Sequence, residues 1–149
     1  MIDKRDNAFL GQNIKGMMMS LISHWNTRMD AARAGTEFVD IRPADMRVFG
    51  NLRGRSVRLS AIHKEMSFSR QAAQQAVDRL VKHGMLEVTL DPNSKRDKLV
   101  SITEKGHRWR SIAADQIRQI ETEIADVIGD DAKEELRSAL TSLLQATQK

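Results

Sequence analysis

Apolar side chains recur at spacings of three and four residues through residues 7–33, which predicts one long amphipathic helix. Gly16 lies inside this stretch and weakens the predicted helix without breaking it. A loop is expected near Gly35, and a second helix is predicted to begin at Pro43. The fixed φ of proline suits the first position of a helix. The apolar stripe of the first helix consists of Phe9, Leu10, Ile14, Met18, Leu21, Ile22, Trp25 and Met29.

The clearest amphipathic helix is predicted over residues 70–83, where one face is apolar and the opposite arc is polar. Gly84 follows it in the manner of a C-cap. Residues 57–66 precede it and suit a short extended segment that leads into a short helix, with Ser60 as the N-cap. The apolar face of the helix over 70–83 consists of Ala73, Ala76, Val77 and Leu80.

An alternating pattern predicts a β-hairpin over residues 85–103. Leu86, Val88 and Leu90 share one side of the first strand, as expected for a half-buried strand. The composition of residues 91–97 is that of a turn, and it places a basic tip on the hairpin. The returning strand is expected over residues 99–103.

Two further helices are predicted after the hairpin. An apolar stripe runs through residues 104–128 and is interrupted at Gly129. Asp131 and Glu134 have the spacing of a capping box, which predicts a last helix from there to about residue 146. The apolar stripes over residues 7–29, 109–128 and 132–144 exceed what a small winged helix needs to cover itself. Two copies packed across a two-fold axis would bury them, whereas a monomer would have to wrap them around its own core.

Charge is distributed unevenly along the 149 residues, which contain 24 Lys and Arg, 20 Asp and Glu, and no cysteine. Residues 53–110 carry 13 basic and 6 acidic side chains, whereas residues 111–149 carry 4 basic and 8 acidic ones. A basic middle segment favours a polyanionic partner. The absence of cysteine excludes disulfides and thiolate chemistry. A charged N-terminus and short apolar runs predict a cytoplasmic protein that neither carries a signal peptide nor spans a membrane.

Enzymatic signatures are missing from the sequence. The four histidines are scattered and lack the spacing of metal ligands. No nucleophile elbow, phosphate-binding loop or dinucleotide-binding fingerprint occurs. The chain is therefore predicted to be no enzyme and to need neither a cofactor nor a metal ion.

The order of short helix, tight turn, polar helix and basic hairpin predicts a mainly α winged helix-turn-helix fold, with a small β-hairpin wing and flanking helices. Side chains near the N-terminus of such a helix reach base edges in the major groove, where Gln suits adenine and Arg suits guanine. The basic wing would contact phosphates or the minor groove. The residues predicted to contact DNA are Ser69, Arg70, Gln71, Gln74, Gln75, Arg79, Lys95, Arg96 and Lys98.

Three segments resemble the MarR family of transcriptional regulators: RPADMRVFGNL at 42–52, SFSRQAAQQAVDRLVKHGMLE at 67–87, and DPNSKRDKLVSITEKG at 91–106. The resemblance implies a homodimer that binds a palindromic operator on double-stranded DNA, usually as a repressor released by a small-molecule effector. It also implies a DNA-binding domain over residues 41–106, flanked by dimerisation helices over 1–40 and 107–149. The alternative is a winged-helix module that binds another protein without reading DNA sequence.

Within the resemblance, Ser69 matches the cap of the recognition helix and Arg96 matches the arginine of the wing. Three positions depart from the family pattern. Ser94 replaces an aspartate that normally braces the wing, so the wing is expected either to be looser or to be held differently, by Asp91 or Asp97. The other two departures are Ser67, at a frequent turn glycine, and His63, at a position that is usually alanine.

An effector pocket is expected from the family between the DNA-binding lobe and the dimerisation helices. Four residues are candidates for its lining by position alone, and the simpler interpretation makes all four ordinary core residues. They are Met17, Trp25, Met46 and Trp109.

Overall fold

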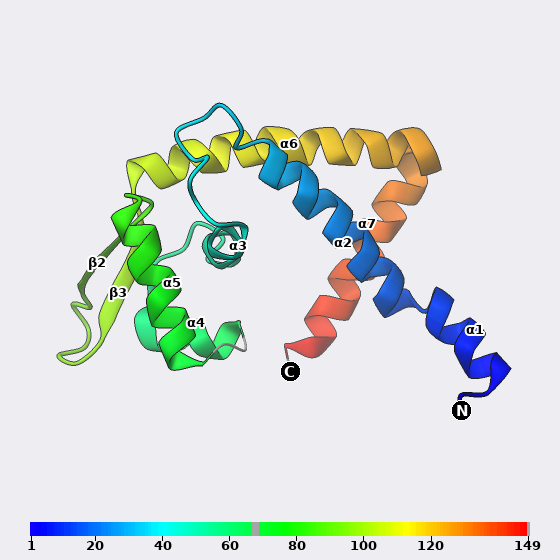
Figure 1. The fold of residues 1–149 in the computed structure, drawn as a ribbon, viewed down its shortest axis with the longest axis horizontal. Coiled ribbons are helices and arrows are strands. Elements are labelled where there is room, and N and C mark those ends of the chain that lie inside the picture. Colours follow the sequence, from blue (N-terminus) through cyan, green and yellow to red (C-terminus); the bar gives the residue numbers. More distant parts are fainter. Residues whose placement is uncertain (67–68, 149) are drawn as a thin grey trace. The chain divides into compact units, whose positions relative to one another are not determined.

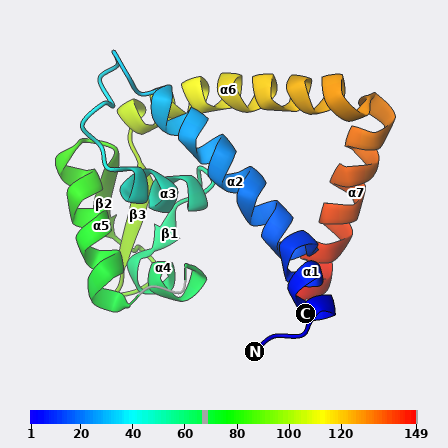
Figure 2. The same ribbon diagram turned by 45° about the vertical axis from the view of Figure 1, so that its right-hand side comes forward.

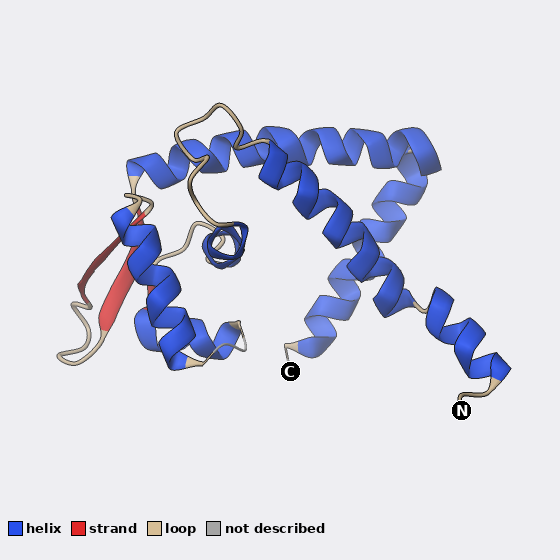
Figure 3. Cartoon of the chain, in the orientation of Figure 1, coloured by secondary structure: helices blue, strands red, loops and turns tan. Residues whose placement is uncertain are grey.

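The computed structural model describes residues 1–66 and 69–148, which form two compact units. One unit comprises Thr27–Ile112. The other comprises Met1–Asn26 together with the chain from Ala113 onward. Figure 1 labels the helices and strands of both units, and Figure 3 shows how few of the residues are in strands.

The unit Thr27–Ile112 contains three short helices, a small sheet, the end of one longer helix and the start of another. Its short helices are α3 (Pro43–Asn51), α4 (Leu59–Glu65) and α5 (Arg70–Lys82). Its strands are β1 (Val57–Arg58), β2 (Leu86–Leu90) and β3 (Lys98–Ile102), which form an antiparallel sheet in the order β1-β3-β2. Val100 of β3 is paired with Val57 on one side and Val88 on the other. The winged helix-turn-helix fold is thereby confirmed.

The core of this unit is built around α5, which packs against α3, α4 and β2 (Figure 2). The predicted apolar face of α5 is buried along its length, and the helix ends where the sequence predicted. Gly84 follows with φ of +76°, a conformation that favours glycine. The largest fully buried side chains of the unit include Leu52, Ile62, Leu80, Met85 and Leu86.

The other unit is helical. It contains α1 (Lys4–Gln12), α7 (Asp130–Thr147), most of α2 (Ile14–Ala31) and most of α6 (Glu104–Ile128). The predicted continuous first helix is wrong, because Asn13 adopts an extended conformation between α1 and α2. The side chain of Asn13 stabilises both ends of this break. Its Nδ2 donates to the carbonyl of Leu10 at 2.8 Å, and its Oδ1 accepts from the amide of Gly16 at 2.8 Å.

Three local predictions also differ from the structure. Ser60 is not an N-cap, because α4 begins one residue earlier and Ser60 donates to Asp97 instead. Leu90 is exposed, because it ends β2 at the wing, beyond the core. Asp131 lies inside α7, which is preceded by Gly129 in a left-handed conformation and has no side-chain cap.

In the residues that the structure describes, no helix is long and apolar enough to cross a membrane. Within the same ranges, no cluster of His, Cys, Asp and Glu side chains has the geometry to hold a metal ion.

Candidate nucleic-acid interface

The N-terminal half of α5 presents polar side chains to solvent. Ser69 caps the helix, as predicted, and its hydroxyl oxygen accepts a hydrogen bond from the amide of Ala72 at 3.1 Å. The buried apolar face of α5 fixes the rotation of the helix, so its opposite face must point outward. That face carries the exposed residues Arg70, Gln71, Gln74 and Gln75.

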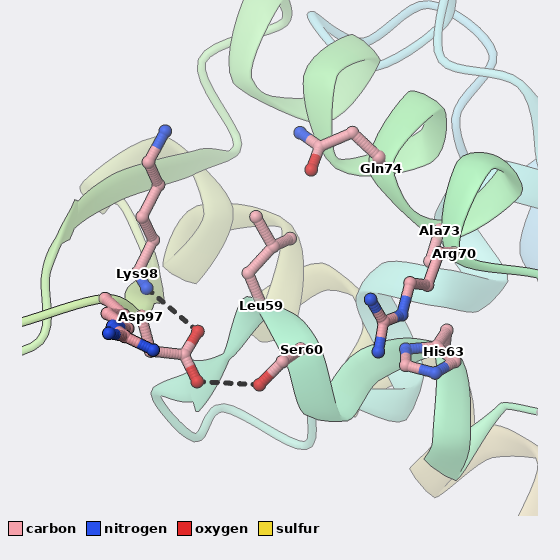
Figure 4. A pocket seen from close by; sticks show the side chains of 9 residues that line it. Leu59, Ser60, His63, Arg70, Ala73, Gln74, Asp97 and Lys98 are labelled. Carbon is pink, nitrogen blue, oxygen red and sulfur yellow. Dashed lines mark hydrogen bonds between the residues drawn. The ribbon is translucent and has the colours of Figure 1, made fainter. Parts of the chain in front are cut away.

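One of the glutamines already has a partner on its own helix. Gln74 Nε2 donates to Asp78 Oδ1 at 2.9 Å, one helical turn away. The amide oxygen of Gln74 takes no part in this hydrogen bond. Figure 4 shows the Gln74 side chain at the upper edge of a groove. A bidentate contact from Gln74 to adenine would require the amide to leave Asp78, whereas Gln71 and Gln75 need no such change.

Arg79 occupies a different environment from the rest of the predicted contact residues. Its Nε and Nη2 donate to the two carboxylate oxygens of Asp45 at 2.8 and 2.9 Å. The side chain of Asp45 is only 1% exposed, and it lies on α3. These hydrogen bonds raise the pKa of the Arg79 guanidinium above its ordinary value. We therefore interpret Arg79 as the residue that joins α5 to α3 and leave it out of the candidate interface.

A groove of about 300 Å³ lies between α4, the start of α5 and the base of the wing (Figure 4). Arg70, Arg96 and Lys98 line it, and no carboxylate in the described ranges forms an ion pair with any of them. His63 and Asp97 line it as well, so the groove carries more positive than negative charge. Its full lining is Leu59, Ser60, His63, Arg70, Ala73, Gln74, Arg96, Asp97 and Lys98.

The base of the wing is tied to the residues around the start of α4. Arg58 Nε donates to Asp91 Oδ2 at 2.6 Å, and Ser60 Oγ donates to Asp97 Oδ2 at 2.6 Å. The amide of Asn93 donates to Asp91 Oδ1 at 2.9 Å, which together with Arg58 lowers the pKa of Asp91. The hydrogen bond from Ser60 is the main cause of the lowered pKa of Asp97.

The expectation that Asp91 or Asp97 holds the wing agrees with these contacts, since both residues do so. Ser94 also contributes at the tip, where its hydroxyl oxygen accepts from the amides of Arg96 at 3.4 Å and Asp97 at 3.2 Å. Lys95 and Arg96 are exposed on the wing. Ser67, the third departure from the family pattern, lies outside the described residues.

The four residues predicted to line an effector pocket lie in different surroundings. Met46 and Trp109 are buried in the unit Thr27–Ile112, where Trp109 packs against Phe38 with ring centroids 5.5 Å apart. Met17 is 49% exposed on α2. Trp25 lines an apolar groove of about 330 Å³ in the helical unit, between α2, α6 and α7.

Sequence reasoning missed Arg58 and Asp45, which position the candidate interface. Each is paired with a residue more than thirty positions away in the chain. No local pattern marks such a pair. The one available signal was the charge itself: Asp45 stands among the inward-facing positions of α3, where a buried carboxylate needs a cationic partner.

Part of the chain matches the sequence pattern of a known family. The model of the MarR family matches residues 39–97. No curated protein sequence matches the chain.

The fold is shared with solved structures over nearly the whole chain. A MarR family protein from Bacillus stearothermophilus is 15% identical, has a TM-score of 0.72, and is aligned over 100% of both chains. The wild-type, apo form of MarR from E. coli is 20% identical with a TM-score of 0.69, over 89% of this chain and 98% of that one. Streptococcus pneumoniae FabT, solved in complex with DNA, is 18% identical with a TM-score of 0.73, over 92% and 96%.

Identities this low establish a common fold, and the match of the family model adds the sequence pattern of the winged helix. Residues 39–97 therefore match the sequence pattern of the MarR family, and the chain has the fold of solved MarR family proteins.

Proposed function

We propose that this protein is a transcriptional regulator that binds double-stranded DNA in a sequence-specific manner. The observation that carries the proposal is the surface formed by the polar half of α5 and the adjoining groove. Three glutamines project from a capped helix beside three cations, Arg70, Arg96 and Lys98, that have no ion-pair partner in the described ranges. Such a surface can read base edges and neutralise phosphates at the same time.

The side chains divide the work by their chemistry. Gln71, Gln75 and, after release from Asp78, Gln74 would bond adenine edges, and Arg70 would bond guanine or a phosphate. Lys95, Arg96 and Lys98 of the wing would contact phosphates or the minor groove, where a cation is favoured by the negative potential. FabT, a protein of the same fold, was solved in complex with DNA, which supports DNA binding as the function but does not bear on single side chains.

Homodimer formation and a palindromic operator complete the proposal. Large apolar side chains are exposed on α1, α2, α6 and α7, among them Phe9, Leu10, Leu21, Leu143 and Leu144. A second copy related by two-fold symmetry would cover them. The two recognition helices would then lie about 34–36 Å apart, one turn of DNA. Repression and its release by a small-molecule effector are the expected output, to be sought by a thermal-shift screen of effector candidates.

The decisive experiment selects bound sequences from a random pool of duplex DNA and reads them by sequencing. We expect enrichment of a palindrome. On the selected site, Gln75→Ala should cost about 1–3 kcal/mol and relax specificity at one position in each half-site, if the contact is bidentate. Arg96→Ala should weaken binding to all sequences and reduce the slope of log K against log salt by about 1 per half-site.

Arg118→Ala is the matched control. Like Arg96→Ala, it removes an exposed arginine, but Arg118 lies on α6, where it pairs with Asp115, and is far from the wing in the sequence. It should bind as the unmodified protein does. A pool without any enriched sequence, together with binding that does not weaken as salt rises, would contradict the proposal. That outcome would favour the alternative, a winged-helix module whose α5 face docks onto another protein.

A further inference from the structure

We propose that Arg58 is a positioning residue for DNA binding, which acts by holding the wing through Asp91 so that Arg96 is presented to the phosphate backbone. The inference rests on the proposed function and names a residue outside the recognition helix and the wing tip. Arg58 is the last residue of β1 and directly precedes α4.

The contact between Arg58 and Asp91 joins two segments that are 33 residues apart in the chain. Arg58 Nε lies 2.6 Å from Asp91 Oδ2, and the side chain of Asp91 is only 5% exposed. The other carboxylate oxygen, Oδ1, accepts from the amide of Asn93. One carboxylate therefore fixes the first turn of the wing and anchors that turn to the end of β1.

A second contact anchors the other end of the wing. Asp97 Oδ2 accepts from Ser60 Oγ, and Asp97 Oδ1 accepts from the amide of Lys98 at 2.9 Å. The amide of Asp91 donates to the carbonyl of Asp97 at 3.1 Å, which closes the loop between the two anchors. The segment between them carries Arg96, so its position is determined by these few bonds.

The tip of the wing supplies no charge to these anchors through Ser94. Ser94 is neutral and uses its hydroxyl oxygen on the amides of the wing itself. The charged brace comes instead from outside the wing, where Arg58 contributes the cation. An ordered wing saves the free energy of ordering it at the moment of binding, which is the usual gain from preorganisation.

Arg58 is also 51% exposed, so it could contact a phosphate directly instead of acting through the wing. A double-mutant cycle separates the two roles. If Arg58 acts by positioning Arg96, we expect Arg58→Ala to lower affinity for the selected DNA site about fivefold to tenfold, the cost of ordering one or two side chains. The double variant Arg58→Ala/Arg96→Ala should then lose clearly less affinity than the product of the two single losses, because most of the effect of Arg58 passes through Arg96. Losses that multiply in the double variant would overturn the proposal.

Amide hydrogen exchange without DNA gives a readout that does not depend on the proposed function. Arg58→Ala should speed exchange across residues 91–98, Arg58→Lys should restore part of the protection by keeping the cation, and Arg118→Ala should change nothing there. Unchanged exchange in Arg58→Ala would overturn the proposal even if DNA affinity fell. If the unmodified protein bound no DNA, the proposed function would fail, and the role of Arg58 in DNA binding would fail with it. Faster exchange in Arg58→Ala would still show that the Arg58–Asp91 ion pair holds the wing.

Discussion

Two arginines on α5 show how much of a residue's role depends on what lies beside it. Arg70 lines the groove next to the wing, where no carboxylate in the described ranges pairs with it. Arg79, nine positions later, gives two hydrogen bonds to a buried aspartate on α3. Both residues are arginines on the same helix, and the sequence alone predicted that both contact DNA. The structure makes the first available to a ligand and commits the second to packing, since an unpaired Asp45 at that depth would be costly.

This difference predicts opposite phenotypes for the two alanine variants. Arg79→Ala leaves the Asp45 carboxylate buried without a partner, so the free energy of unfolding should fall by about 2–3 kcal/mol. This loss is smaller than the loss expected when a fully buried ion pair is broken, because the Arg79 side chain is 36% exposed to solvent. Arg70→Ala should change stability by less than about 0.5 kcal/mol but lower DNA affinity. Urea unfolding and a DNA titration of both variants measure this. A stable Arg79→Ala protein that has lost DNA affinity would restore Arg79 to the interface.

At the scale of elements, the wing depends on two carboxylates whose pKa values are both lowered in the folded protein. A lowered pKa means that the unfolded wing binds protons more readily than the folded wing does. The contribution of these residues to stability is thus complete above their ordinary pKa of about 3.9 and is lost as the pH falls through the lowered values. The wing should therefore be insensitive to pH near neutrality and should open in acid.

Nuclear magnetic resonance provides the measurement, because the amides of Asn93 and Lys98 donate to these two carboxylates. Their proton shifts should titrate with midpoints below about 3.9, the value for a free aspartate. In Asp91→Asn the titration at Asn93 should disappear, while the one at Lys98 persists. Midpoints above 4 would show that the ion pair and hydrogen bonds of the wing do not form in solution.

The elements themselves follow from local patterns far better than the bonds between them do. Pro43 begins α3, Ser69 caps α5 and Gly84 ends it, because each signal acts within a few residues of its own position. Asn13 was missed since the apolar stripe continues through it, although its side chain can cap a helix as well as any other. The pair of Arg58 with Asp91 depends on the antiparallel sheet, and no periodicity in the sequence encodes that distance.

For the whole molecule, charge and apolar exposure are separated along the sequence. The excess of basic side chains falls in residues 53–110, inside the unit that holds the candidate interface. The acidic C-terminal segment instead carries exposed leucines on α7, including Leu136, Leu143 and Leu144. Acidic side chains would be repelled by DNA, while exposed leucines favour burial against another surface. This division is consistent with the proposal that the unit Thr27–Ile112 binds DNA and that the helical unit binds a second copy of the chain.

Leu143→Arg tests that division of labour. Leu143 is 60% exposed on α7, and burying a leucine contributes about 1.5–3 kcal/mol. Since a symmetric dimer contains the residue twice, the substitution should weaken dimerisation by roughly 3 kcal/mol or more, at least a hundredfold. Sedimentation velocity at micromolar concentration should show a dimer for the unmodified protein and a monomer for the variant, with unchanged far-ultraviolet circular dichroism. Gln145→Arg adds the same charge at an exposed polar position of α7 and should leave the dimer intact. Leu143→Arg should also lose most of its affinity for a palindrome while binding a single half-site as before, because the two winged helices would no longer bind as one unit. A monomer in the unmodified protein, or a dimer that survives the new arginine, would place the dimer interface elsewhere or remove it.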